Sequence, residues 1–356
     1  MTNATPTDVV IGVDTHKEVH AAVAISGSGV HLATTTVPSS SKGHGALEAW
    51  AKSMGAVRAF GIEGTGSYGA GLSRFLRERG HAVFEVNRPN RQLRHQRGKS
   101  DAVDAESAAR AVLAGQAAGQ PKSGTGTVEM IRHLKVARDT AVKARTQAMQ
   151  TLKANIVCSP DALREQLDQV SGKRTLLRRL AALRPGPLTS TLASAKASLR
   201  AIARRWLLLD TEIKQHDAHL ETLTPARAPD LLEAHGMATG TAAEMLLLVG
   251  DNPERIHSEA AFAKLCGACP IPASSGKTNR HCLDRGGNRQ ANATLYRVVI
   301  VRMRGHQPTL DYVRRRTAEG KSKSEIIRCL KRYVAREVFG YLCAKPTLAD
   351  ATATSS

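Results

Sequence analysis

Four carboxylates fall where a metal-dependent phosphoryl-transfer site would need them. Asp14 ends a run of β-branched residues that is typical of a buried strand, and Glu63 ends a second such run. Asp101 and Asp104 stand three residues apart at the start of a predicted helix, so they share one face of that helix. Carboxylate oxygens are the ligands that Mg²⁺ prefers. The four acids together therefore predict an Mg²⁺ site for phosphoryl transfer.

Each acid taken alone has a simpler explanation. An aspartate at a strand end often only begins a turn, and the first turn of a helix attracts Asp because of the helix dipole. The interpretation of the four acids as one metal site depends on which strands are neighbours in the sheet. If the strand near residues 57–62 lies beside the strand near residues 9–13, Asp14 and Glu63 project from neighbouring strand ends.

A second group that could do chemistry lies in the last third of the chain. The stretch PASSGKTNRHCLDRGGNR contains Ser274 and Ser275 in a predicted loop. It also contains four cations that could stabilise an ionised serine or hold a phosphate: Lys277, Arg280, Arg285 and Arg289. Spacing alone favours an ordinary turn serine.

A basic segment precedes the helix of Asp101. Among its cations are Arg94, Arg97 and Lys99, which could steer a phosphodiester backbone toward the acids. A solvated run of charges is the alternative.

The elements that must position these residues alternate between strand and helix patterns up to about residue 115. Three apolar runs near 9–13, 19–25 and 30–37 precede a helix near 45–54, a strand near 57–62, a helix near 70–80, a strand near 81–86 and a helix near 100–113. Three antiparallel strands followed by alternating helices and strands are typical of a ribonuclease H-like mixed sheet with helices on both faces. We therefore predict an α/β catalytic domain over residues 1–120.

The rest of the chain is predicted to be all-α. Residues 121–228 show heptad-like spacing, broken at Pro160 and in the RPGP sequence, and indicate a coiled-coil-like dimerisation arm. Residues 229–345 form a mostly helical last domain that carries the serine loop, and residues 346–356 form a disordered tail. Around HGMATG we expect either a helix-hairpin-helix that contacts phosphate or an ordinary turn between helices.

Charge identifies the class of partner. The 356 residues include 51 Lys and Arg against 31 Asp and Glu, a formal net charge of +20. Such a chain usually binds nucleic acid, although ribosomal and membrane-surface proteins share the signature. Aromatic residues make up only 3%, which argues against binding by base stacking. Cys266, Cys269 and Cys282 lack a fourth ligand at zinc spacing, so we expect free thiols in a reducing cytoplasm.

The motifs in this order resemble one family. The IGVDTHK strand end with Asp14, the EGTGSY turn with Glu63, the KSDAVD helix start, the PASSGK loop and the GNR helix start are similar to the DEDD-motif insertion-sequence transposases, the Piv/MooV group or IS110 family. The likeness covers nearly the whole chain. The HGMATG turn departs from the G-x-G hairpin that is usual in the family.

The resemblance implies a transposase and site-specific DNA recombinase. Asp14, Glu63, Asp101 and Asp104 would hold Mg²⁺, and Ser275, with Ser274 as the fallback, would form a covalent phosphoserine link to DNA. The family combines two domains from different protomers in one site, so a dimer or tetramer is implied. A noncoding bridge RNA would pair with donor and target double-stranded DNA.

Two alternatives remain open at this point: a RuvC-like endonuclease that resolves junctions by hydrolysis, and a non-catalytic basic scaffold. No signal peptide or membrane span is evident, so a cytoplasmic bacterial protein that joins the nucleoid through DNA is expected.

Overall fold

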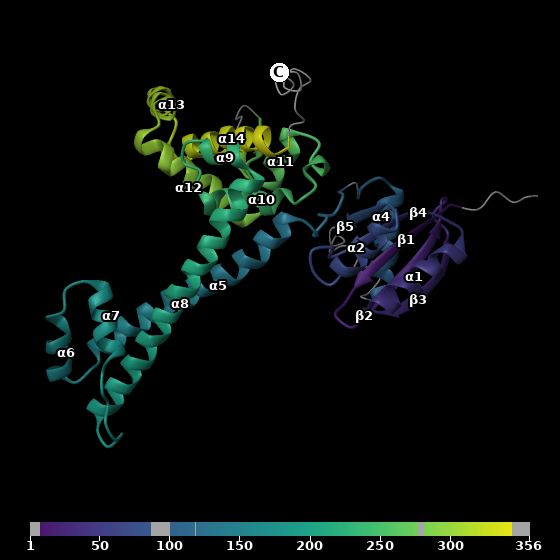
Figure 1. The fold of residues 1–356 in the computed structure, drawn as a ribbon. Coiled ribbons are helices and arrows are strands. Elements are labelled where there is room, and N and C mark those ends of the chain that lie inside the picture. Colours follow the sequence, from purple (N-terminus) through teal and green to yellow (C-terminus); the bar gives the residue numbers. More distant parts are fainter. Residues whose placement is uncertain (1–7, 87–99, 118, 277–280, 344–356) are drawn as a thin grey trace, which may run out of the picture. The chain divides into compact units, whose positions relative to one another are not determined.

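The computed structural model describes residues 8–86, 100–117, 119–276 and 281–343. The chain forms two compact units (Figure 1). Unit 1 contains the described residues of Met1–Gly126 and Cys343–Ser356 together with Val249–Phe262. Unit 2 contains Thr127–Leu248 and Ala263–Leu342. The finer division at residues 120, 228 and 345 stays a prediction.

Unit 1 is built on a mixed five-stranded sheet. Its elements in chain order are β1 (Asp8–Thr15), β2 (Val19–Ser26), β3 (His31–Pro38), α1 (Ser41–Met54), β4 (Ala56–Glu63), α2 (Ala70–Glu78), β5 (Val83–Val86) and α4 (Asp101–Leu113). The strand order is β3-β2-β1-β4-β5. β2 is antiparallel to β1 and β3, whereas β4 is parallel to β1 and β5. The predicted order of elements is confirmed, and so is the predicted pairing of the strands that carry Asp14 and Glu63.

Helices cover both faces of this sheet. On one face, Val9, Ile11 and Val13 of β1 pack in a core with residues of α1 and α2, among them Leu47 and Leu72. On the other face, a second core contains Val10 of β1 and residues of β2 and α4. Successive side chains of a strand point to opposite faces. The α4 face therefore receives the even-numbered residues of β1, and Asp14 is one of them.

Helix α4 approaches the sheet closely because both surfaces are made of small residues. A Cβ atom added at Gly12 of β1 would lie 1.9 Å from the carbonyl oxygen of Ala105 and 2.4 Å from the amide nitrogen of Ala109. One added at Gly61 of β4 would lie 2.9 Å from the carbonyl oxygen of Ala108. Only glycine allows this backbone contact, so these two glycines set the height of α4 above the site.

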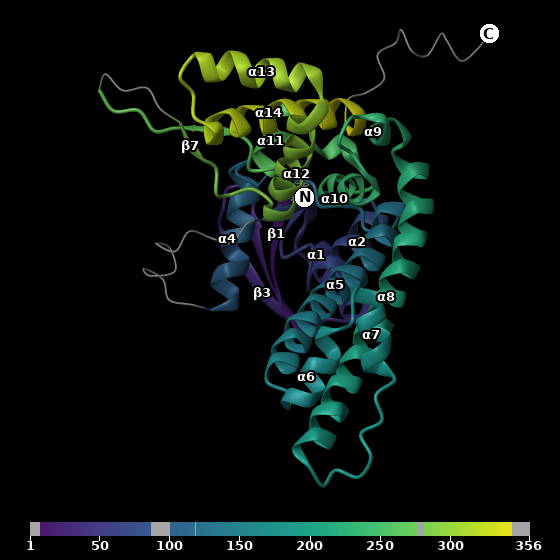
Figure 2. The ribbon, with the colours of Figure 1, turned by 90° about the vertical axis from the view of Figure 1, so that its left-hand side faces the viewer.

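Unit 2 contains a long pair of helices. They are α5 (Thr127–Val157) and α8 (Thr191–Arg227), which lie side by side in Figures 1 and 2. Between them come α6 (Asp161–Asp168) and α7 (Lys173–Ala181), so the helical region has four pieces where the sequence predicted three. The extra break is at Gly172, whose φ of +87° suits glycine. Pro225 lies inside α8, which continues to Arg227.

The remaining elements are helices of varied length and one small two-stranded ribbon. They are α9 (Pro229–Glu233), α10 (Thr239–Val249), a 3₁₀ turn (Pro253–Arg255), α11 (Glu259–Leu265), β6 (Pro270–Pro272), β7 (His281–Leu283), α12 (Arg289–Gly305), α13 (Gln307–Ala318) and α14 (Lys323–Leu342). The HGMATG sequence joins α9 to α10, as the pattern of two short helices predicted. Figure 2 shows α13 above α14. The amino-terminal part is thus α/β and the carboxyl-terminal part mostly helical, as predicted.

Candidate metal centre and serine loop

The sheet and α4 bring the predicted carboxylates to one edge. Gly12 pairs with Gly61 and Val13 with Ile62, so Asp14 and Glu63 occupy the next register position on adjacent parallel strands. Alternation places both on the face that α4 covers. The helix begins at Asp101, with its N-cap at Ser100, whose side chain accepts a hydrogen bond from the amide of Val103. The first turn of α4 therefore starts beside the two strand ends.

The helical repeat explains which acid lies over which strand. Asp101, Ala105 and Ala109 are spaced by four and form one row, whose alanines contact β1 at Gly12. Asp104 and Ala108 form the adjacent row, whose alanine contacts β4 at Gly61. The same packing that fits α4 to the sheet therefore carries both aspartates toward the strand ends.

Burial and mutual repulsion act on the carboxyl group of Asp14. Asp14 is 8% exposed to solvent and Asp104 is 5% exposed. Burial raises the pKa of Asp14, and the charges of Asp104 and Asp101 raise it further, while His16 opposes them. Converging carboxylates of this kind favour a bound cation, which stabilises their ionised forms. The residues present therefore fit a divalent metal ion.

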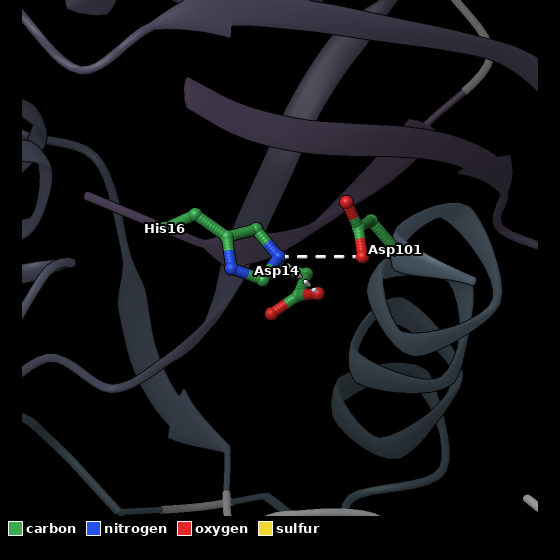
Figure 3. A group of neighbouring side chains, drawn as sticks. All are labelled: Asp14, His16 and Asp101. Atoms are coloured by element: carbon green, nitrogen blue, oxygen red, sulfur yellow. Dashed lines mark hydrogen bonds and ion pairs between the residues drawn. The ribbon is translucent and has the colours of Figure 1, made fainter. Parts of the chain in front are cut away.

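His16 belongs to this site and was missed in the sequence analysis. Its Nε2 atom lies 3.1 Å from Oδ2 of Asp14 and 3.3 Å from Oδ1 of Asp101 (Figure 3). The three side chains form a group whose ligand atoms all lie within 4.8 Å of one another. A histidine two residues beyond a strand-end aspartate was a visible signal, because the two can face the same site across a turn.

The turn after Glu63 is held against β1. Thr15 donates a hydrogen bond of 2.7 Å from Oγ1 to the carbonyl oxygen of Glu63. Gly64 has a φ of +72°, and its carbonyl oxygen accepts from the amides of Ser67 and Gly69. A left-handed residue is needed here to turn the chain from β4 toward α2. The glycine-rich turn therefore has a structural role next to the acids.

The serine loop lies in unit 2, whereas the four acids lie in unit 1. β6 and β7 pair as an antiparallel ribbon, with Ile271 opposite Cys282. Ser274 and Ser275 are exposed in the connection between the two strands. Gly276, the next residue, has a φ of +53°. The loop thus presents its hydroxyl groups on the surface, which is where an attacking group must be to reach DNA.

Hydrogen bonds from polar side chains hold the segments on both sides of this ribbon. Before β6, the side-chain amide of Asn292 donates to the carbonyl oxygens of Cys266 and Gly267 at 2.9 and 2.8 Å. The amide oxygen of Asn292 in turn accepts from the buried Lys331 at 2.9 Å. After β7, Asp284 accepts from the amide of Gly286 at 2.8 Å. These contacts anchor the segments that flank the exposed loop.

Asp284 also pairs with Lys264 at 3.0 Å. The Gly286 amide is the main cause that lowers the pKa of Asp284, and Lys264 adds to the effect. Helix α12 then begins at Arg289, and the side chain of its N-cap Asn288 accepts from the amides of Gln290 and Ala291. The GNR sequence is therefore a helix start, as predicted.

Two family models match the chain. One, described as a transposase model of the DEDD type from IS110 elements, matches residues 11–157, and the other, described as Transposase IS116/IS110/IS902 family, matches residues 228–314. Together they cover well over half of the 356 residues. The chain belongs to the IS110 transposase family. No curated protein matches it in a direct comparison.

Each of the two matched regions of this transposase contains one of the two candidate groups of residues. The first region contains the four acids, and the second contains the serine loop with Arg285 and Arg289, which are both exposed. The other predicted nucleic-acid contacts lie outside the described residues: Arg94, Arg97, Lys99, Lys277 and Arg280. Cys266, Cys269 and Cys282 are free thiols.

Family membership makes this transposase a DNA-processing enzyme that has DNA as its partner. None of the helices that the structure describes is long and apolar enough to cross a membrane.

Proposed function

We propose that the protein cuts and rejoins donor and target double-stranded DNA by Mg²⁺-dependent phosphoryl transfer, with Asp14, Glu63, Asp101 and Asp104 holding the metal and Ser275 acting as nucleophile. The observation that carries the proposal is the group formed by Asp14, His16 and Asp101, with Asp104 close enough for its charge to act on Asp14. Asp14 and Glu63 occupy the ends of adjacent parallel strands, and the first turn of α4 adds the other two. The family match supports the DNA substrate.

A bound Mg²⁺ would neutralise negative charge that develops on the attacked phosphate. The chain's own part in the proposed reaction is to place the carboxylates at a fixed spacing, through the glycine contacts under α4. In the serine step, the Ser275 hydroxyl loses its proton and its oxygen forms a bond to phosphorus. The bond from phosphorus to one sugar oxygen breaks, and that oxygen gains a proton. A hydroxyl of another strand reverses the step and restores the serine.

The RuvC-like, ribonuclease H fold of the first domain is part of this proposal, and the mixed sheet order β3-β2-β1-β4-β5 supports it. We also propose that acids and serine from different protomers of a dimer or tetramer complete the site. A noncoding guide RNA fits a chain of formal net charge +20 that has few aromatic residues. We expect the protein in the bacterial cytoplasm, at the nucleoid when DNA is bound.

Recombination between a donor and a target plasmid tests this function. Asp14→Asn and Ser275→Ala should each abolish recombination and leave DNA binding within about twofold of wild type, since both substitutions keep the side-chain size nearly unchanged. Glu106→Gln is the matched control, because Glu106 lies on α4 but pairs with Arg110. Full activity of either site variant would refute the proposal, and nicked DNA from the Ser275→Ala protein would favour hydrolysis.

The guide RNA is tested separately. Ribonuclease treatment of the purified protein should remove recombination, and adding back the co-purified RNA should restore it. Recombination that survives complete removal of RNA would contradict the RNA part of the proposal and leave the acid site untouched.

A further inference from the structure

One stretch of unit 2 carries cations and no carboxylates. Between Asp168 and Asp210 the sequence contains nine Lys and Arg residues and not one Asp or Glu. The nine are Lys173, Arg174, Arg178, Arg179, Arg184, Lys196, Arg200, Arg204 and Arg205. They lie on α7, on the first half of α8 and on the connection between these helices. We call this set the arm-tip surface.

Packing turns these cations outward. Leu177 and Leu180 of α7 join Leu199 and Ala203 of α8 in one apolar core. Arg178 and Arg179 of α7 lie outside that core and are exposed. In Figures 1 and 2, α7 lies against α8 at the end of the helix pair where α6 also lies.

Few of the cations are neutralised within the chain. In this fully described segment, Arg174 pairs with Asp210 at 3.2 Å, and Arg204 donates from Nε to the carbonyl oxygen of Ala181 at 3.1 Å. Lys173 lies 4.6 Å from the centre of the Trp206 ring. No carboxylate is paired with the remaining six in the structure of this segment.

The rest of the helix pair is different. Arg138 of α5 pairs with Asp217 of α8, and Arg145 of α5 pairs with Asp210. Opposite charges therefore connect the two helices over that part. Exposed cations also occur on α5, among them Lys143 and Lys153, but carboxylates also occur along that part of the pair, whereas the arm-tip surface is the stretch from which carboxylates are missing altogether. This local concentration of positive charge indicates a specific partner at this place.

The chemistry of the arm-tip surface selects a phosphate backbone. Lys196, Arg200 and Arg204 follow one another at intervals of four residues, which is about 6 Å along a helix. Phosphates along one strand of a duplex are spaced at about 3.4 Å along the axis, so this row matches roughly every second phosphate. The stretch has one aromatic residue, Trp206, and it is buried, so stacking on unpaired bases is not available.

We propose that the arm-tip surface binds the sugar-phosphate backbone of a nucleic-acid duplex. The inference rests on the proposed function only in that a recombinase must hold duplex DNA or the paired stem of a guide RNA. Duplex DNA and a paired RNA stem both present two regular rows of phosphates. The experiment below distinguishes which of these two duplexes the surface binds.

The test measures binding of the full-length protein to two fluorescent probes, a 20-base-pair DNA duplex and an RNA hairpin with a stem of about the same length. The test variant is Arg178→Gln/Arg179→Gln/Arg205→Gln, three exposed residues of the arm-tip surface. The matched control is Lys143→Gln/Lys153→Gln/Arg164→Gln, which removes the same charge from exposed positions on α5 and α6. Thermal unfolding checks that both variants fold.

For a DNA partner, the slope of log K against log salt should fall by about 0.9 for each phosphate contact that the test variant loses, and affinity near 0.1 M salt should drop roughly eightfold per contact. The control should lose less than about twofold. Loss with only one probe identifies the duplex that the surface binds.

Equal losses in the test and control variants would overturn the proposal, because they would show only a general effect of net charge. Unchanged binding by the test variant would overturn it as well. A change in oligomeric mass, measured by light scattering, together with unchanged binding per protomer would assign the surface to self-association instead. If the wild-type protein bound neither probe, the proposed function itself would fail, and this outcome is distinct from the others.

Discussion

Replacing Gly12 with alanine tests how α4 is placed over the sheet. The added Cβ would lie 1.9 Å from a backbone carbonyl oxygen of α4, whereas real Cβ atoms keep at least 3.0 Å, so the helix must retreat by about 1 Å. Overpacking of this kind costs about 1–3 kcal/mol of unfolding free energy. The retreat also carries the first turn of α4, with Asp101 and Asp104, away from Asp14.

Activity should suffer as well as stability. A misplacement of about 1 Å in a catalytic constellation can lower the rate roughly 100-fold. We therefore expect the Gly12→Ala variant to fold, to unfold at lower urea concentration and to cleave DNA about two orders of magnitude more slowly. Urea unfolding followed by circular dichroism and single-turnover strand cleavage measure the two effects.

Gly45→Ala is the matched control. Gly45 lies inside α1, and the nearest atom to an added Cβ is 3.9 Å away, in the Phe75 ring. Alanine in a helix interior is more stable than glycine by about 0.5–1 kcal/mol, so this variant should gain stability and keep its cleavage rate. A Gly12→Ala protein with the stability and the rate of wild type would refute the account of how the acids are positioned.

Three further predictions concern single side chains. His16→Ala should bind Mg²⁺ about 2- to 10-fold more tightly in calorimetry, because the cation no longer has to displace a ring nitrogen that contacts two of its carboxylates; weaker binding would mean that His16 is a ligand. Burial is the main cause that lowers the pKa of both His20 and His44, so the unfolded chain binds more protons than the folded one as the pH falls below 6.5, and unfolding free energy should fall there. His20→Leu should reduce that pH dependence in urea titrations. An unchanged pH profile would contradict the claim that the His20 and His44 rings are buried without charge in the folded protein. Lys331→Met should lower unfolding free energy by about 1–3 kcal/mol, because it leaves the amide oxygen of Asn292 without its donor; a melting temperature equal to that of wild type would contradict the role of this bond under the serine loop.

Local patterns were sufficient to predict the strands of unit 1. The run Val9–Val13 and the acid after it indicated a buried strand with a functional end, and β1 runs from Asp8 to Thr15. The partner strand was predicted by the same pattern near Glu63. Helix ends were less accurate, since α1 begins at Ser41, four residues before the expected start, because Ser40 caps it.

Long-range packing could not be predicted from local patterns. The contact of His16 with Asp101 depends on the height of α4, and that height depends on Gly12 meeting Ala105, a residue 93 positions later in the chain. A glycine in an apolar strand indicates a close approach but does not name the element that approaches. The break at Gly172 was missed because serine and glycine between two amphipathic stretches fit a continuous helix nearly as well.

The most direct test of the central claim is a search for a covalent protein–DNA adduct. Purified protein with its co-purified RNA, Mg²⁺ and end-labelled DNA that spans the element junction is run on a denaturing gel, with Ser274→Ala and Ser275→Ala beside wild type. The account predicts a labelled adduct in wild type and Ser274→Ala that is absent in Ser275→Ala and in Asp14→Asn. Free nicked strands without an adduct in wild type and both serine variants would contradict it and would assign the acids to hydrolysis.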